Sequence, residues 1–107
     1  MTDSLAVLEQ RVARDLDYLN YPQRTWVAAD AEVYNVIIVG AGQGGLATAF
    51  GLSRKGIAGV LVLDDSPEGW EGPWETYARM ETLRTPKDVT GPDLGVASLT
   101  FRAWYEA

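Results

Sequence analysis

The chain has 107 residues, a length that allows one small folded domain at most. It has a formal net charge of −6 at pH 7, and its 47% hydrophobic residues are too many for a compositionally disordered chain. An acidic chain without a basic stripe argues against nucleic-acid binding. The sequence has no cysteine and no histidine. Their absence excludes disulfides, thiolate nucleophiles, zinc–thiolate sites and the most common general base, so no metal site is expected. Any catalysis must therefore depend on a bound cofactor.

The first 30 residues (1–30) are predicted to form an amphipathic helix and a connector. Over residues 4–20, apolar side chains recur at three- and four-residue steps and form one face, made of Leu5, Leu8, Val12, Leu16 and Leu19. We expect this face to pack on its own protein, with a coiled-coil or membrane-surface role as the alternative. The connector covers residues 21–30, and its Trp26 is expected to dock on the domain that follows.

The beginning of the chain lacks the basic segment and apolar core of a signal peptide. The longest apolar run is far shorter than a membrane span. The sequence therefore predicts a cytoplasmic protein with no membrane partner.

An apolar strand predicted over residues 33–39 leads into a Gly-x-Gly-x-x-Gly turn. In such turns each glycine has its own purpose. Gly40 permits a sharp turn, Gly42 lets a pyrophosphate approach the backbone, and Gly45 allows the next helix to pack closely on the strand. The strand before the turn and the helical pattern after it make the motif specific. It predicts a dinucleotide-binding site.

The helix that follows the turn is expected to supply the phosphate contacts. Its first N–H groups, from Gln43 and Gly44 to Leu46, have no partner within the helix, and the helix dipole adds partial positive charge there. No lysine or arginine lies inside the turn. The backbone itself is therefore expected to bind the phosphates.

A second buried strand is predicted over residues 59–63, and it ends in two aspartates. Asp64 follows Gly45 by 19 positions, close to the roughly 20 expected for an acid that binds the ribose hydroxyls. We assign Asp64 to the ribose first and Asp65 second.

The loop after these aspartates is rich in aromatic and basic side chains, and loops at the carboxyl ends of parallel strands form the binding crevice. Trp74 and Tyr77 are candidates for covering a flat ring. Arg79, Arg84 and Lys87 are candidates for contacting phosphate or an anionic reduced flavin. The alternative is that the tryptophans are core residues and the arginines are solvated.

The predicted fold class is α/β, with a parallel β-α-β unit preceded by the amphipathic helix. Only two strands are evident, and parallel sheets need cover on both faces, so we expect the fold to be incomplete and the chain to be part of a larger protein. Residues 1–30 form the helix and connector, and residues 31–107 form a partial dinucleotide-binding domain. Residues 99–106 are predicted to begin another helix.

Residues 36–52 resemble the first segment of flavoproteins with two dinucleotide-binding domains. Residues 69–74 resemble the loop of flavin-containing and Baeyer–Villiger-type monooxygenases in which Gly-Gly-Thr-Trp is usual, whereas this chain has Gly-Pro-Trp. Residues 83–87 and 99–105 are similar to bacterial FAD/NAD(P)-binding oxidoreductases. The resemblance extends over about residues 33–107, and the glycine turn is its most specific part.

This resemblance implies the N-terminal part of a Rossmann-like FAD/NAD(P)-binding domain, from a flavin-dependent oxidoreductase of the monooxygenase kind. FAD is the implied cofactor, with Gly40, Gly42 and Gly45 at its pyrophosphate, Asp64 at its ribose and Trp74 near the flavin. NADPH or NADH and a small-molecule substrate are expected for the full-length family, at sites outside this chain. No catalytic residue and no oligomeric state follow, and the segment alone is expected to be inactive.

Two other functions stay open at this point. The glycine turn does not separate FAD from NAD, so an NAD(H)-binding unit of a dehydrogenase is one alternative, although the tryptophan-rich loop favours FAD. NADP is disfavoured because Asp64 would repel a ribose 2′-phosphate. The other alternative is a non-catalytic nucleotide-binding or interaction module that docks through its leucine-striped helix.

Overall fold

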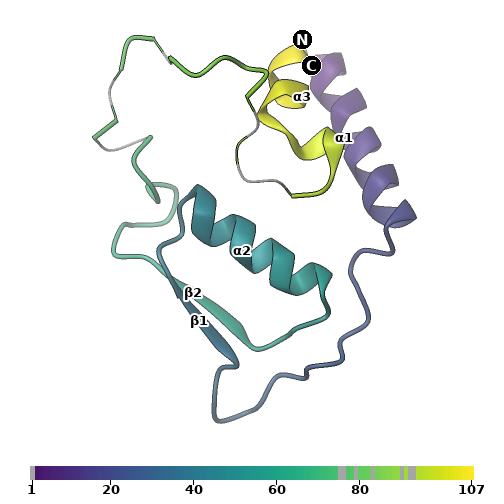
Figure 1. The fold of residues 1–107 in the computed structure, drawn as a ribbon, viewed down its shortest axis with the longest axis vertical. Helices are drawn as coiled ribbons and strands as arrows, with labels where there is room; N and C mark the ends of the chain where they lie inside the picture. The colour runs from purple at the N-terminus through teal and green to yellow at the C-terminus, as the bar shows by residue number, and fades with distance from the viewer. Residues whose placement is uncertain (1, 75–76, 79, 83, 90, 92–93) are drawn as a thin grey trace. The chain divides into compact units, whose positions relative to one another are not determined.

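The computed structural model describes residues 2–74, 77–78, 80–82, 84–89, 91 and 94–107. The chain divides into two compact units, one of residues 1–22 and 83–107 and the other of residues 23–82. The elements follow the order α1, β1, α2, β2, a 3₁₀ helix η1 and α3 (Figure 1). No helix in the described part of the chain is long and apolar enough to cross a bilayer.

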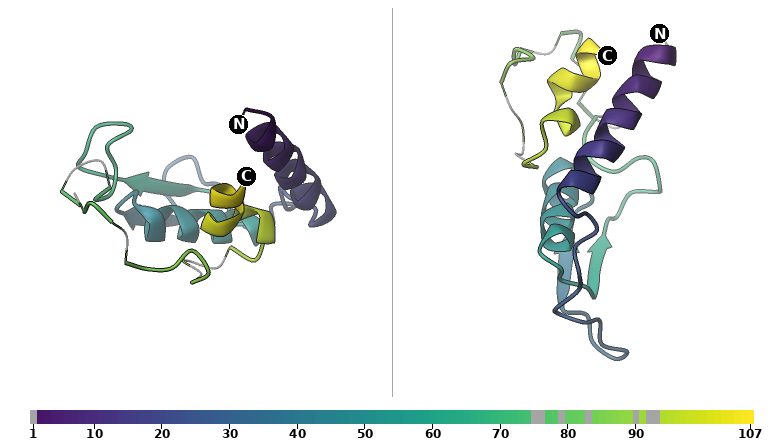
Figure 2. Two further views of the ribbon diagram at one scale, coloured as in Figure 1. Left: turned by 90° about the horizontal axis from the view of Figure 1, so that it is seen from above. Right: turned by 90° about the vertical axis from the view of Figure 1, so that its right-hand side faces the viewer.

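The unit of residues 23–82 is a parallel β-α-β unit. Strand β1 (Val36–Val39) pairs in parallel with β2 (Val60–Leu63), with Val36 opposite Val60 and Val39 opposite Leu63. Helix α2 (Gln43–Arg54) connects them. It runs alongside the two strands in the further views of Figure 2. The expected α/β class and strand–turn–helix–strand order are therefore confirmed.

Both strands are shorter than predicted. The expected strand over residues 33–39 begins only at Val36, although the Asn35 backbone amide already donates to the Gly59 carbonyl at 2.8 Å. The Asn35 amide group donates to the carbonyl oxygens of Ala28 and Ala58, each at 2.8 Å. The Asn35 side chain therefore joins the connector to the segment before β2. Strand β2 begins at Val60, one residue later than predicted.

The connector docks on this unit as expected. The Trp26 indole N–H donates to the carbonyl oxygen of Lys55, at the end of α2. Next to it, Val27 forms an isolated parallel bridge with Ile57. Trp26 nevertheless keeps most of its surface exposed, so it is anchored by a hydrogen bond rather than by burial.

The other unit joins the two ends of the described chain. Helix α1 (Thr2–Tyr18) contacts η1 (Ala97–Leu99) and α3 (Phe101–Glu106). The buried Ser98 hydroxyl donates to the Asp15 carboxylate at 2.7 Å, and this bond is the main reason that the pKa of Asp15 lies below its ordinary value. The packing of α1 on its own chain agrees with the first interpretation of its apolar face.

Three helix boundaries differ from the predicted ones, and the first is the start of α1, which lies at Thr2 rather than at residue 4. Helix α1 ends at Tyr18, before Asn20, whose φ of 57° is left-handed and cannot continue a helix. The helix predicted over residues 99–106 begins at Phe101, because the Thr100 hydroxyl caps it by accepting from the Ala103 amide at 3.1 Å.

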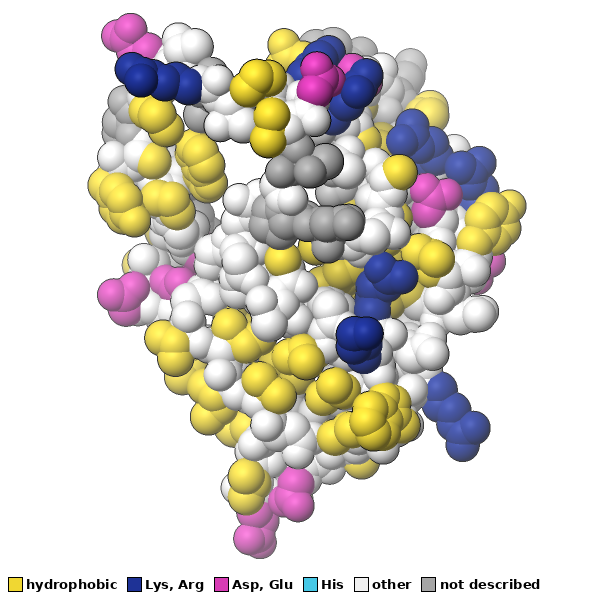
Figure 3. Space-filling view, in the orientation of Figure 1, with side chains coloured by type: hydrophobic (Ala, Val, Ile, Leu, Met, Phe, Trp, Pro, Cys, Tyr) yellow, Lys and Arg dark blue, Asp and Glu magenta, His cyan; other side chains and the backbone are white. Residues whose placement is uncertain are grey.

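Apolar side chains remain widely exposed. Figure 3 shows hydrophobic groups scattered over the visible face. Among the described residues, Val96 is the one apolar residue that is nearly fully buried, with 5% of its surface exposed. On the sheet, Ile37 and Val39 are 55% and 86% exposed. Helix α2 therefore covers one face of the sheet and leaves the other open.

Candidate functional site

The glycine turn, residues 40–45, connects β1 to α2. Gly40 has a φ of 106°, in the left-handed region, and its N–H donates to the Leu63 carbonyl at 2.6 Å. A Cβ atom placed on Gly45 would lie 1.8 Å from the Gly40 carbonyl oxygen. The close approach of helix and strand expected at Gly45 is therefore present, and it fixes the shape of the turn.

The N-terminus of α2 presents unpaired backbone donors. Gly42 is the N-cap, with an extended backbone (φ −79°, ψ −168°), and no side chain caps the helix. The first acceptor within α2 is the Gly42 carbonyl, which receives the Leu46 amide at 3.0 Å. The preceding amides, from Gln43 to Gly45, consequently have no acceptor within the helix. Such amides, with the helix dipole behind them, suit an anion.

Asp64 connects the end of β2 to the glycine turn. Its Oδ2 accepts the Ala41 amide at 2.8 Å, and its Oδ1 accepts the Ser66 amide at 2.8 Å. These two backbone bonds, the Ala41 bond first, hold the pKa of Asp64 below its ordinary value. Asp64 is half-buried. Each carboxylate oxygen has a further lone pair for a ligand hydroxyl, so the arrangement is compatible with the predicted ribose contact.

The other predicted site residues are less constrained. Asp65 is exposed, and Trp74, at the end of the loop after β2, is 53% exposed. Tyr77 is 83% exposed. Lys87 belongs to the other unit, where its ammonium group forms an ion pair with the Glu106 carboxylate at 3.0 Å. Arg79 lies outside the described residues.

Two contacts of the site were not predicted from the sequence. The loop of residues 65–74, called the post-β2 loop below, returns to the glycine turn, where Gly72 lies against Gly42. A signal was present, since Gly72 precedes a proline within a loop already assigned to the ligand side. The hydrogen bond between Asp64 and Ala41 was also missed, because nothing in the sequence shows which backbone amide a carboxylate will accept.

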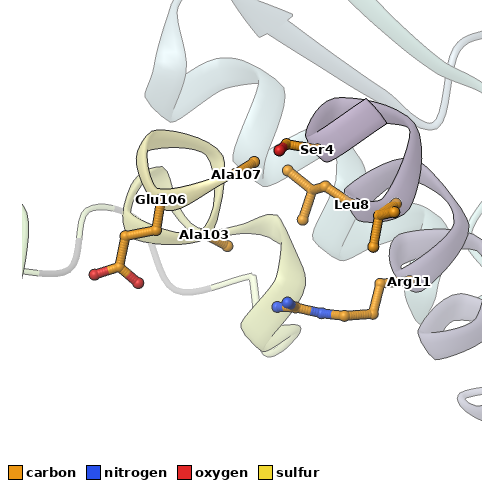
Figure 4. Close-up of a pocket in the computed structure, with 7 residues that line it drawn as sticks. Ser4, Leu8, Arg11, Ala103, Glu106 and Ala107 are labelled. Atoms are coloured by element: carbon orange, nitrogen blue, oxygen red, sulfur yellow. The ribbon is translucent and has the colours of Figure 1, made fainter. Parts of the chain in front are cut away.

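A separate cavity of about 490 Å³ lies in the other unit. It is lined by Ser4, Val7, Leu8, Arg11, Ala103, Glu106 and Ala107. In Figure 4 the Glu106 carboxylate points away from α1. Lys87, and then Arg102, pair with it and hold its pKa low. Of the two charged residues that line this cavity, Arg11 extends toward the space between α1 and α3, whereas the Glu106 carboxylate is turned away from it.

Comparison with known proteins shows what kind of enzyme the chain is similar to. No protein-family model and no solved structure matches the chain. The chain is 55% identical, over 97% of its length, to the FAD-dependent urate hydroxylase of Xanthomonas campestris pv. campestris. It spans 23% of the length of that relative. The relative depends on FAD, the cofactor that the family resemblance implies. The predicted resemblance to flavin-dependent oxidoreductases is therefore confirmed: this chain is similar, over nearly all of its length, to part of a FAD-dependent hydroxylase.

Proposed function

We propose that the chain is the FAD-binding segment of a flavin-dependent oxidoreductase, within a Rossmann-like domain that begins near residue 31. The observation that carries the proposal is the uncapped start of α2 at Gly42, directly after β1. It provides backbone donors for a pyrophosphate where a dinucleotide-binding fold needs them. The similarity to a FAD-dependent hydroxylase selects FAD over NAD.

The described residues fit FAD by their chemistry. Amides of Gln43, Gly44 and Gly45 would hold the pyrophosphate without a cationic side chain, and Asp64 would accept from the ribose hydroxyls. Asp65 is the second choice for the ribose. Trp74 is proposed to lie near the flavin. FAD supplies the redox chemistry, and this chain binds and orients it.

The proposal for a whole protein goes further. The relative acts on urate by name, so we propose urate hydroxylation, with NADPH or NADH as the reductant, as the first activity to test in a longer protein that contains this segment. The segment alone is expected to bind FAD without turnover, because the nicotinamide and substrate sites are assigned to other parts of the family's chain.

A FAD titration of the purified chain tests the proposal. Visible absorbance reports flavin that stays with the protein, and tryptophan fluorescence reports quenching in the same samples. We expect saturable binding in the native chain and none in Gly42→Val, whose branched side chain would press against Gly72 and displace the N-cap that precedes the amides proposed for the pyrophosphate. Gly51→Ala, on α2 with open space around its added Cβ, is the matched control and should bind FAD normally.

A pair of aspartate variants tests the ribose assignment. Asp64→Ala should weaken FAD binding by about ten- to a hundredfold, through the loss of charge-assisted hydrogen bonds, and Asp65→Ala should have a smaller effect. A larger effect of Asp65→Ala would move the assignment by one residue. Quenching by NADH without any response to FAD would replace the proposal with a dehydrogenase unit.

A further inference from the structure

Two glycines from separate segments face each other beside the candidate site. A Cβ atom placed on Gly42 would lie 3.6 Å from the Gly72 Cα, and one placed on Gly72 would lie 3.5 Å from the Gly42 Cα. Each absent side chain therefore points toward the other residue's backbone. A single methyl group fits at ordinary contact distance, but two would compete for the same gap.

The post-β2 loop is connected to the glycine turn at two places. Directly before the loop begins, the Asp64 carboxylate accepts from the Ala41 amide of the turn and from the Ser66 amide of the loop. Farther along, the loop makes a turn in which the Trp70 amide donates to the Pro67 carbonyl at 2.9 Å, and it then reaches Gly72. The loop therefore runs from the carboxylate at the end of β2 back to the N-cap of α2.

Gly69 in the same loop provides a contrast. Both Gly69 and Gly72 have positive φ, of 88° and 74°, so a side chain strains the backbone at either position. A Cβ on Gly69 would meet nothing within 4 Å, whereas one on Gly72 would meet Gly42. Backbone conformation explains Gly69 completely, but Gly72 also makes a contact with the turn.

We propose that Gly72 is a positioning residue of the dinucleotide site: it lets the post-β2 loop close against Gly42 and so sets the position of the N-cap whose neighbouring amides bind the pyrophosphate. This inference rests on the proposed function. The Gly42–Gly72 contact restricts the backbone at the N-cap, directly before the amides of Gln43 to Gly45.

A double-mutant cycle tests the contact and its purpose. The variants are Gly42→Ala, Gly72→Ala and their combination, with Gly69→Ala alone and combined with Gly42→Ala as the control cycle. Urea unfolding should show non-additive destabilisation for the 42/72 pair and additive effects for the 42/69 pair. FAD titration should show an affinity for Gly72→Ala at least tenfold lower than for Gly69→Ala.

The two readouts separate the possible failures. Additive unfolding effects for the 42/72 pair would show that the contact is absent and would overturn the inference. Equal FAD affinities of Gly72→Ala and Gly69→Ala would leave only a structural contact, and would overturn the positioning role. No FAD binding by the native chain would overturn the proposed function together with this role, while the unfolding cycle would still report whether the contact exists.

Cysteine pairs keep the contact testable if the alanine variants fold poorly. The sequence has no cysteine, so any disulfide comes from the introduced residues. Gly42→Cys combined with Gly72→Cys should form a disulfide under mild oxidation, detected as a mass loss of about two hydrogens and a loss of thiol labelling. Gly42→Cys with Gly69→Cys is the control. Equal crosslinking of both pairs, or crosslinking of the control alone, would overturn the inference.

Discussion

The Asp64 carboxylate has a structural role in the chain, and it is also the proposed ribose contact. It joins the end of β2 to the glycine turn through the Ala41 amide and to the following loop through the Ser66 amide. Because both donors favour the ionised form, the pKa of Asp64 is lower in the folded state than in the unfolded chain. The stabilisation is therefore complete above the unfolded pKa and is lost as the pH falls through the lower folded pKa.

This linkage predicts a pH-dependent effect of Asp64→Asn. The native chain should be more stable than the variant near pH 7, and the difference should shrink below about pH 4, the ordinary carboxyl range. Urea unfolding at a series of pH values measures it. Asp65→Asn, at the exposed neighbour, is the control. A difference between the native chain and Asp64→Asn that grew on acidification would contradict the hydrogen bonds assigned here.

Gly45 is predicted to tolerate no side chain. In Gly45→Ala the new Cβ would meet the backbone of Gly40, so β1 and α2 must separate, at a cost of about 1–3 kcal/mol. Gly51→Ala, in the same helix with open space, should instead stabilise by about 0.5–1 kcal/mol, because alanine is the better helix former. Denaturant unfolding compares them. Equal effects of the two substitutions would show that helix propensity, rather than close packing against Gly40, determines the change in unfolding free energy.

At the scale of elements, the two faces of the sheet are expected to contribute differently to the stability of the chain. Ile38 points to the face that α2 covers, since a Cβ on Gly45 would come within 3.4 Å of its side chain. Ile37, the preceding residue, is 55% exposed on the opposite face. Ile38→Ala should therefore destabilise the chain by about 1 kcal/mol more than Ile37→Ala. Both variants replace isoleucine by alanine within β1, so the change in strand propensity is the same in each and does not affect the comparison.

Denaturant unfolding of these two variants reports whether the open face is covered. If Ile37→Ala cost as much as Ile38→Ala, the outer face would be packed against something in solution. A second copy of the chain is the simplest case, and sedimentation at two protein concentrations would detect it.

The order of elements was predictable because local signals coincided. An apolar run before Gly40, a helical pattern after Gly45 and a second apolar run ending at Asp64 allow one arrangement, the parallel β-α-β unit. The Asn35 side chain bonds to carbonyls 7 and 23 positions away, and the sequence does not show these partners. The start of α3 was more predictable, because Thr100 caps it through the local Ala103 amide and threonine is a preferred N-cap. Within the site, the turn and the acid were found from spacing, but the contact of Gly72 with Gly42 needed the folded loop.

At the scale of the whole molecule, little apolar surface is fully buried. Each unit packs around few residues, and in the described part of the chain Val96 is the apolar residue with the least exposed surface. Burial of apolar area is the main favourable contribution to folding, so the chain is expected to be only marginally stable without a ligand. A ligand that binds only the folded chain then adds a large share of its stability.

This reasoning predicts that FAD raises the melting temperature of the chain. At a FAD concentration one hundred times the dissociation constant, the added stability is about 2.7 kcal/mol. Thermal unfolding followed by circular dichroism, with and without FAD, measures the shift. Gly51→Ala should show the same shift as the native chain, and Gly42→Val should show none, because its side chain would press against Gly72 and displace the N-cap beside the amides proposed for the pyrophosphate. An equal shift in Gly42→Val would place the flavin away from the glycine turn, since no other change separates that variant from the native chain.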